Sequence, residues 1–390
     1  KKERKMVRTV SDFVAEALVS AGVTHVFGGH GGAVVPLIDA IEAHPKLTWV
    51  YMRNEANASL AAHAAAKLNP GVVGCCLATS GPGATNLTTG LVCGKMDAVP
   101  MIAITGMKPS YKASLVDFQD IENDRLFAGV LDYSKRVVHP FQAPLLMRDA
   151  LGFALSRRTC VHLAFPEDIQ EHELDENHQV LLESAIHPLL STPPSEANVQ
   201  KTADFIESQV ATKSRILIAV GHLGVNAGAE ITALAELINA PIVTRLDAKG
   251  VVDESHPLCI GVAGVHGSPG VAATRDMIES ADCIFSIGVE DQMLGQFVVT
   301  GGVQNRGLIY VMPDTSTVTG QFNAGAMMIG TVEDSLRMLT EELKSRGAAK
   351  GFVRPEKPED VQATNLQDSS LADGHNFPVA LAWSRFQSGA

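Results

Sequence analysis

The sequence predicts an α/β protein built from two doubly wound domains, each formed around a parallel sheet. Apolar runs of strand length alternate with longer amphipathic runs of helix length, which is the order that repeated βα units produce. A length of 390 residues is more than one ordinary core holds and suits two or three domains. A hydrophobic content of 46% against 19% charged residues is typical of a globular chain with a large interior.

The first domain is expected over residues 7–171, with its last strand closing near Pro166. Its strand-like runs are short and apolar, and strands joined through helices pair in parallel and are buried on both faces. We expect strands at 23–27, 47–51, 71–77 and 100–105, and helices at 11–21, 33–43, 54–68 and 84–94.

The second domain is expected over residues 196–345, after a polar, proline-containing linker at 172–195. Ser195 is a candidate N-cap for the helix that opens this domain. A segment rich in Gly, Pro, Asp and Ser, 346–390, is interpreted as a linker and tail leading toward a missing third domain. Within the second domain we expect strands at 216–220, 241–244, 283–287 and 308–311, and helices at 228–239, 271–280 and 333–345.

The composition argues against several classes of function. The net charge of −12 is spread along the chain without a basic stripe, so nucleic acid is not expected as a partner. The six cysteines form no C-x-x-C pair and favour a reducing, cytoplasmic compartment, and the histidines form no zinc-ligand pattern. Residues 71–94 carry no charge, but Ser80 to Gly83 interrupt the run. A buried strand-turn-helix is therefore expected there, not a membrane span.

Two stretches place chemistry-bearing residues directly after predicted strands. One is the turn F-G-G-H-G-G-A at 27–33, where glycines let the backbone approach a ligand. Tight βα turns also use glycine for purely steric reasons. The other is M-R-N-E at 52–55, which opens an alanine-rich helix with Glu55. An acid in a first helical turn often only complements the helix dipole, but here it also follows a strand, where open α/β sheets hold ligands.

Two further stretches complete the pattern: T-S-G-P-G-A-T-N at 79–86, and M-D-A-V-P at 96–100 followed by D-F-Q-D at 117–120. Each alone is compatible with ordinary turn chemistry. In this order and spacing, the four stretches closely resemble the pyrimidine-binding domain of thiamine-diphosphate-dependent enzymes, and of acetolactate synthases in particular.

The resemblance continues into the second domain and covers about residues 7–345. K-G at 249–250, H-P at 256–257, G-V-H-G at 264–267 and A-D at 281–282 are similar to the family's central, Rossmann-like domain. The resemblance therefore implies a pyrimidine-binding domain followed by a central Rossmann-like domain.

The family resemblance also implies roles for individual residues. Glu55 is expected to hydrogen-bond the aminopyrimidine of thiamine diphosphate, so that the cofactor's thiazolium carbon is deprotonated and attacks a 2-oxo acid. Gln119 is expected to act beside it in catalysis, with Phe118 on the substrate side. The family forms homodimers or tetramers. The cofactor-binding set that the resemblance implies is Gly31, Gly32, Glu55, Pro82, Asn86 and Gln119.

The sequence departs from the family pattern in its metal site. The G-D-G motif that begins the family's diphosphate and Mg²⁺ site does not occur, so no metal ligand is assigned to this chain. The ligands for Mg²⁺ and the diphosphate are expected from a missing domain or from a second chain that carries it. A fragment, a split-enzyme subunit and a genuine loss of the third domain stay open.

Two charged residues bear on substrate and flavin. Asp132 stands where acetolactate synthases have a substrate-side lysine, which puts specificity for pyruvate in doubt. Glu290 stands where FAD-binding relatives have an arginine, which weakens the case for FAD. Four residues resemble other flavin contacts and keep FAD open: Arg158, Val265, His266 and Gly267.

Two hypotheses of function follow. The first is an enzyme component, a thiamine-diphosphate-dependent transferase or lyase with acetolactate synthase-like carboligation or decarboxylation of a 2-oxo acid. The second is a non-catalytic, truncated paralogue that serves as a binding or assembly partner. A partial chain of a complete enzyme is the third reading. The residues do not decide the acceptor or whether the product is an acyloin, an aldehyde or a thioester.

Overall fold

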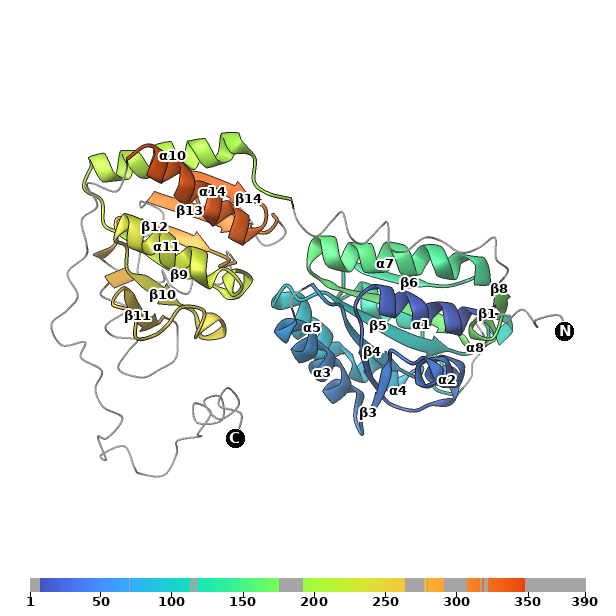
Figure 1. Ribbon diagram of the computed structural model, residues 1–390. Helices are drawn as coiled ribbons and strands as arrows, with labels where there is room; N and C mark the ends of the chain where they lie inside the picture. Colours follow the sequence, from blue (N-terminus) through green and yellow to red (C-terminus); the bar gives the residue numbers. More distant parts are fainter. Residues whose placement is uncertain are drawn as a thin grey trace, which may run out of the picture. The chain divides into compact units, whose positions relative to one another are not determined.

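The structure is a computed structural model, and its described chain divides into two compact units between Pro194 and Ser195 (Figure 1). Each unit is described by itself below. The described residues are 8–69, 71–112, 115, 118–174, 192–263, 277–278, 280–290, 307–315, 318 and 322–347.

The first unit contains a six-stranded sheet in which every pair of neighbouring strands is parallel. The strand order is β3-β2-β4-β5-β7-β6, so the chain starts inside the sheet and builds outward in both directions. β4, β5 and β7 are buried along their whole length, which explains why their sequences are continuous apolar runs. The strands are β2 (His25–Gly28), β3 (Thr48–Tyr51), β4 (Gly74–Ala78), β5 (Met101–Met107), β6 (Tyr133–Arg136) and β7 (Cys160–Pro166).

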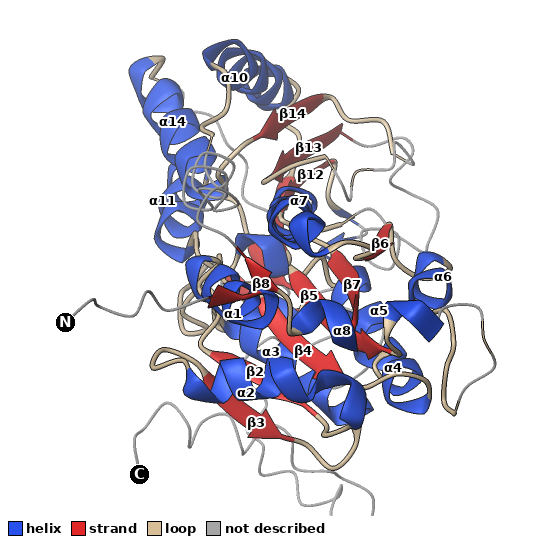
Figure 2. Ribbon diagram, turned by 90° about the vertical axis from the view of Figure 1, so that its right-hand side faces the viewer, coloured by secondary structure: helices blue, strands red, loops and turns tan. Residues whose placement is uncertain are grey.

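Helices cover both faces of this sheet, as the blue ribbons around the red strands show (Figure 2). α1, α2 and α7 share one apolar cluster, and α3, α5 and α6 share the other. The helices are α1 (Val10–Ser20), α2 (Val35–Ala43), α3 (Glu55–Leu68), α4 (Pro82–Asn86), α5 (Thr88–Met96), α6 (Asn123–Ala128), α7 (Ala143–Arg157) and α8 (Glu167–Gln170), with a small antiparallel pair formed by β1 (Arg8–Thr9) and β8 (Glu173–Leu174).

The second unit is also a six-stranded parallel sheet, with the order β11-β10-β9-β12-β13-β14. Its described helices α10, α11 and α14 bury their apolar sides in one common cluster. The elements are β9 (Ile216–Val220), β10 (Ile242–Thr244), β11 (Cys259–Val262), β12 (Cys283–Ile287), β13 (Gly307–Met312), β14 (Ala326–Ile329), α10 (Glu196–Ala211), α11 (Gly228–Ile238) and α14 (Val332–Ser345).

The predicted fold class, α/β with two doubly wound parallel sheets, is confirmed. Ser195 caps α10 as expected, since its hydroxyl accepts a hydrogen bond from the backbone N–H of Asn198. The helix predicted at 84–94 is wrong in detail, because it is two helices, α4 and α5, that meet at Leu87. The helix predicted at 271–280 lies largely outside the described residues. None of the described helices has the length and apolar character needed to cross a membrane.

Candidate active site

Glu55 is the first residue of α3 and follows β3, which ends at Tyr51. The preceding residue, Asn54, has an extended backbone and caps the helix, because its Oδ1 accepts a hydrogen bond from the N–H of Ala56 at 2.9 Å. The carboxylate therefore lies at the positive end of a helix and at the carboxyl edge of the sheet, where open α/β folds hold ligands.

The half-buried Glu55 carboxylate lies against two glycines, Gly29 directly after β2 and Gly83 at the start of α4. A Cβ atom added at Gly29 would lie 2.9 Å from Oε1, and one added at Gly83 would lie 3.3 Å from the same atom. Oε2 accepts a hydrogen bond from Nδ2 of Asn86 at 3.0 Å, while no described residue donates to Oε1. One carboxylate oxygen is thus fixed by the protein, and the other lies close against the two glycines.

Gln119 follows β5 and meets the T-S-G-P-G-A-T-N segment at Gly81. We call this segment, residues 79–86, the octet turn. Both residues have a left-handed backbone, with φ of +56° at Gln119 and +60° at Gly81. A Cβ atom at Gly81 would lie 2.5 Å from the carbonyl oxygen of Gln119, so only glycine fits there. The structure therefore brings the octet turn and the Phe118–Gln119 segment together, although they are far apart in the sequence.

The other residues of the predicted set lie around these turns. A Cβ atom at Gly31 would lie 2.3 Å from Cβ of Thr79, so the turn after β2 packs directly on the octet turn. Gly32 has no neighbour within 4 Å of an added Cβ atom. Pro82 is exposed as the first residue of α4, and 74% of the surface of Phe118 is exposed.

Sequence reasoning missed part of this arrangement. It did not show that the Asn86 amide donates to the Glu55 carboxylate, and contact of Asn86 with the cofactor stays a prediction. It expected the turns at 28–32 and 80–86 to border the pyrimidine but did not single out Gly29 and Gly83, the residues whose missing side chains border Oε1. The only signal in the sequence was that both glycines lie in turns between a strand and a helix.

Asp97 of the M-D-A-V-P stretch links two helices of the first unit. Asp97 accepts a hydrogen bond from Nζ of Lys67 at 2.7 Å, and Nε2 of His63 lies 3.1 Å from the same carboxylate, which joins α3 to the end of α5. The neighbouring His63, together with Lys67, holds the pKa of Asp97 well below its usual range. Asp132 pairs with Lys95 at 2.8 Å, so its charge is met by a residue of the same unit.

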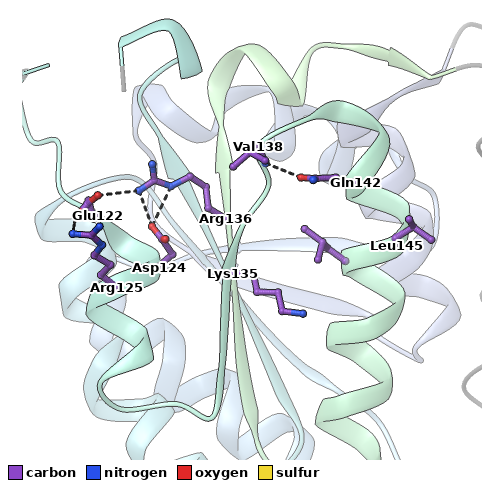
Figure 3. Close-up of a pocket in the computed structure, with 9 residues that line it drawn as sticks. Glu122, Asp124, Arg125, Lys135, Arg136, Val138, Gln142 and Leu145 are labelled. Atoms are coloured by element: carbon purple, nitrogen blue, oxygen red, sulfur yellow. Dashed lines mark hydrogen bonds and ion pairs between the residues drawn. The ribbon is translucent and has the colours of Figure 1, made fainter. Parts of the chain in front are cut away.

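A cavity of about 670 Å³ lies in the same unit but at the other edge of the sheet (Figure 3). Its wall includes β6, the edge strand farthest in the strand order from β3 and Glu55. Its charges pair with each other, with Arg136 2.8 Å from Asp124 and Arg125 2.7 Å from Glu122. We therefore do not take it as the active site. Its lining residues are Glu122, Asp124, Arg125, Lys135, Arg136, Val138, Gln142, Leu145 and Leu146.

Comparison with known families agrees with this geometry. The N-terminal TPP-binding domain of thiamine pyrophosphate enzymes matches residues 8–126, and the central domain of the same enzymes matches residues 199–339. This chain belongs to the thiamine pyrophosphate enzyme family. Each matched segment lies within one of the two parallel-sheet units, and the first segment contains Glu55 and Gln119.

Curated relatives within this family are acetolactate synthases. The probable acetolactate synthase large subunit of Methanococcus aeolicus is 30% identical over 338 residues, which cover 85% of this chain and 55% of the relative. Acetolactate synthase isozyme 1 large subunit of Escherichia coli (strain K12) is 30% identical over 292 residues, covering 74% of this chain and 50% of the relative. The chain thus spans about half the length of these relatives.

The described part of the central unit gives no support for a flavin. The turns after β9 and β12 meet directly, since a Cβ atom at Gly221 would lie 2.4 Å from the carbonyl oxygen of Gly288. Beside them the buried Glu290 lies 3.3 Å from Nη1 of Arg245, which also pairs with Asp247 at 3.1 Å. Arg245 is thus engaged by two carboxylates and is not available to neutralise a diphosphate.

The four residues that resembled flavin contacts add no support. Arg158 ends α7 in a left-handed conformation with φ of +49°. Val265, His266 and Gly267 lie outside the described residues. Across the described chain, no group of three His, Cys, Asp or Glu side chains is placed to hold a metal ion.

Proposed function

We propose that this chain is part of a thiamine-diphosphate-dependent enzyme that acts on a 2-oxo acid, as acetolactate synthases do, and that Glu55 activates the aminopyrimidine. The observation that carries the proposal is the placement of the Glu55 carboxylate, with Oε2 held by Asn86 and Oε1, which has no donor among the described residues, lying against Gly29 and Gly83. A flat heteroaromatic ring fits against a carboxylate only where neighbouring side chains are absent.

The protein's own groups explain how Glu55 would work. The hydrogen bond from Asn86 holds Oε2, so the carboxylate keeps one orientation and presents Oε1. Oε1 would share a proton with a ring nitrogen of the aminopyrimidine, and the positive end of α3 stabilises the carboxylate when that proton leaves. When bound, the cofactor supplies a carbon nucleophile and an electron sink for decarboxylation.

Gln119 is proposed to contact the reacting part of the cofactor, with Phe118 toward the substrate. The contact between Gln119 and Gly81 supports this role, because it puts the residue beside the octet turn whose Gly83 borders Glu55. We propose that the Mg²⁺ ion and the diphosphate are held by a further domain or a second chain, in a homodimer or tetramer.

A non-catalytic partner protein is the second candidate. It is favoured by the ion pair between Asp132 and Lys95, which leaves an acid where a substrate-side lysine was expected. Retention of Glu55, with Oε1 lying against Gly29 and Gly83, favours the enzyme instead.

Calorimetric titration with thiamine diphosphate and Mg²⁺ tests the assignment of Glu55. Since the ligands for Mg²⁺ and the diphosphate are proposed to lie outside this chain, we expect the full chain alone to bind weakly, and Glu55→Gln to weaken that binding by roughly 10- to 150-fold, the effect of losing a hydrogen bond to a charged group. Glu42→Gln, an exposed substitution on α2, is the matched control and should bind as the wild type. Equal binding by Glu55→Gln would remove the assignment of Glu55. No binding by the wild type would leave the chain either as a half-site that needs the further domain or as the non-catalytic partner.

A further inference from the structure

A chain of buried polar side chains lies under α6, directly after the Phe118–Gln119 segment. Thr105, Asn123 and His162 are all 0% exposed. Nδ2 of Asn123 donates to Oγ1 of Thr105 at 3.1 Å and to the carbonyl oxygen of Gly106 at 3.0 Å. Oγ1 of Thr105 lies 2.8 Å from Nε2 of His162. The first residue of α6 is thus attached to the carboxyl end of β5 and to the interior of β7.

The same chain returns to α6 on its other side. Nδ1 of His162 lies 2.8 Å from Oγ of Ser134 on β6, and that hydroxyl donates to the carbonyl oxygen of Asp124 at 2.8 Å. The Asp124 carboxylate also accepts two hydrogen bonds from Arg136, at 2.8 and 3.1 Å. Two successive residues of α6 are therefore held from three strands.

With a neutral imidazole, only one arrangement of protons satisfies every bond in this chain. The Ser134 hydroxyl donates a hydrogen bond to the carbonyl oxygen of Asp124, so it must accept a hydrogen bond from Nδ1–H of His162. A neutral imidazole then has a bare Nε2, which accepts the proton of the Thr105 hydroxyl, and Thr105 accepts from Asn123. With His162 neutral, each group therefore donates to the next, from Asn123 through Thr105, His162 and Ser134 to the carbonyl oxygen of Asp124. Burial agrees with this state, since it lowers the pKa of His162 to about 3.

Simple filling of space does not explain these side chains. Their surroundings are apolar, with the Phe127 ring centroid 4.2 Å from that of His162 and Leu131 and Cys160 in the same cluster. Aliphatic side chains would pack there without the cost of burying hydroxyl, amide and imidazole groups. The polar chain instead fixes the orientation of α6, because its end bonds hold Asn123 against β5 and Asp124 against β6.

We propose that Asn123, Thr105, His162 and Ser134 form a positioning network that holds the Gln119 turn against Gly81. Gln119 precedes Asn123 by four residues, so the turn has one fixed end at the network and one close contact at Gly81. A left-handed glutamine is a strained conformation that persists only where its surroundings hold it. The catalytic meaning of the network rests on the proposed role of Gln119, whereas the positioning itself is a property of the ligand-free chain.

The test compares Thr105→Val, which keeps the shape but removes the hydroxyl, with Thr105→Ser, which keeps the hydroxyl. The first readout is amide hydrogen exchange in α6 and just after it, where Leu126 and Leu131 donate to backbone carbonyls. We expect Thr105→Val to accelerate exchange there by roughly 5- to 150-fold, because two buried groups lose their partner. Exchange in α2 should be unchanged, and Thr105→Ser should resemble the wild type.

The second readout is the NMR signal of Gln119 in ligand-free chain carrying isotope-labelled glutamine, since a left-handed backbone gives distinctive carbon shifts. We expect Thr105→Val to average or broaden this signal and Thr105→Ser to preserve it. Ser134→Ala, a milder change at the outer end, should act in the same direction if Thr105→Val does not fold. An unchanged Gln119 signal in the folded variant, or acceleration spread evenly over α2 and α6, would overturn the proposal. The cofactor titration bears on the proposed function only, and its result does not alter this outcome.

Discussion

Lowering the pH from 7 to 4.5 is expected to destabilise the first unit through one buried imidazole, His162. Burial lowers its pKa from 6.5 to about 3, so the folded unit keeps it neutral over this range. The unfolded chain takes up a proton below pH 6.5, and proton uptake by the unfolded state alone favours unfolding as the pH falls. Two pH units below 6.5 correspond to a loss of about 2.7 kcal/mol, at about 1.36 kcal/mol for each unit.

Urea unfolding at pH 7 and at pH 4.5 measures this loss, with His162→Gln as the comparison. Glutamine keeps an amide donor and a carbonyl acceptor but does not titrate. Trp49 packs against the core of the first unit and reports its unfolding by fluorescence, provided that both proteins carry Trp383→Phe. The stability that Asp97 gains from its lowered pKa is lost only as the pH falls through and below about 3.8, so it lies outside the window. Equal losses in the two proteins would refute the reasoning.

Two further predictions concern the octet turn and the cysteines. Gly81→Ala should destabilise the first unit by about 1–3 kcal/mol and weaken cofactor binding, since alanine resists a left-handed backbone and its methyl group would meet the Gln119 carbonyl. Gly152→Ala is the control, because Gly152 lies in α7 with open space at the added Cβ atom, and it should stabilise the first unit by about 0.5–1 kcal/mol. Urea titrations compare the stabilities of the two variants. Equal effects of the two substitutions would count against the close contact of Gly81 with Gln119. Iodoacetamide at pH 8 should label Cys93 first, because Cys93 alone of the six free cysteines is exposed. Burial raises the pKa of the Cys76 thiol to about 12, so this thiol should react slowly. Early labelling of Cys76 in mass spectrometry would contradict this expectation.

Much of the fold was predictable because parallel sheets leave a simple record in the sequence. β4, β5 and β7 are buried on both faces, so they read as continuous apolar runs separated by helices. The break at Leu87 was not predictable, since residues on both sides of it are compatible with one helix. The sequence could place Glu55 after a strand, but it could not show that Asn86 reaches the carboxylate 31 positions away.

The His162 network was missed for a similar reason. His162 stands in an apolar strand, where a single histidine reads as an ordinary core residue. Its partners Thr105 and Ser134 are 57 and 28 positions away, and they meet it only because β5, β7 and β6 are neighbours in the sheet. Strand order is a property of the folded chain, and no local pattern encodes it.

The site itself is best understood from that strand order. β3, β2, β4 and β5 are successive neighbours, and the chain after each contributes one part: Glu55, the turn at Gly29, the octet turn, and Gln119. The first three parts follow their strands closely, so the strands fix them. Gln119 lies twelve residues beyond the end of β5 and needs another support. The next strands, β7 and β6, supply His162 and Ser134, which hold α6 just after the Gln119 turn. Substitutions in the network should therefore displace Gln119 and leave the contacts of Glu55 intact.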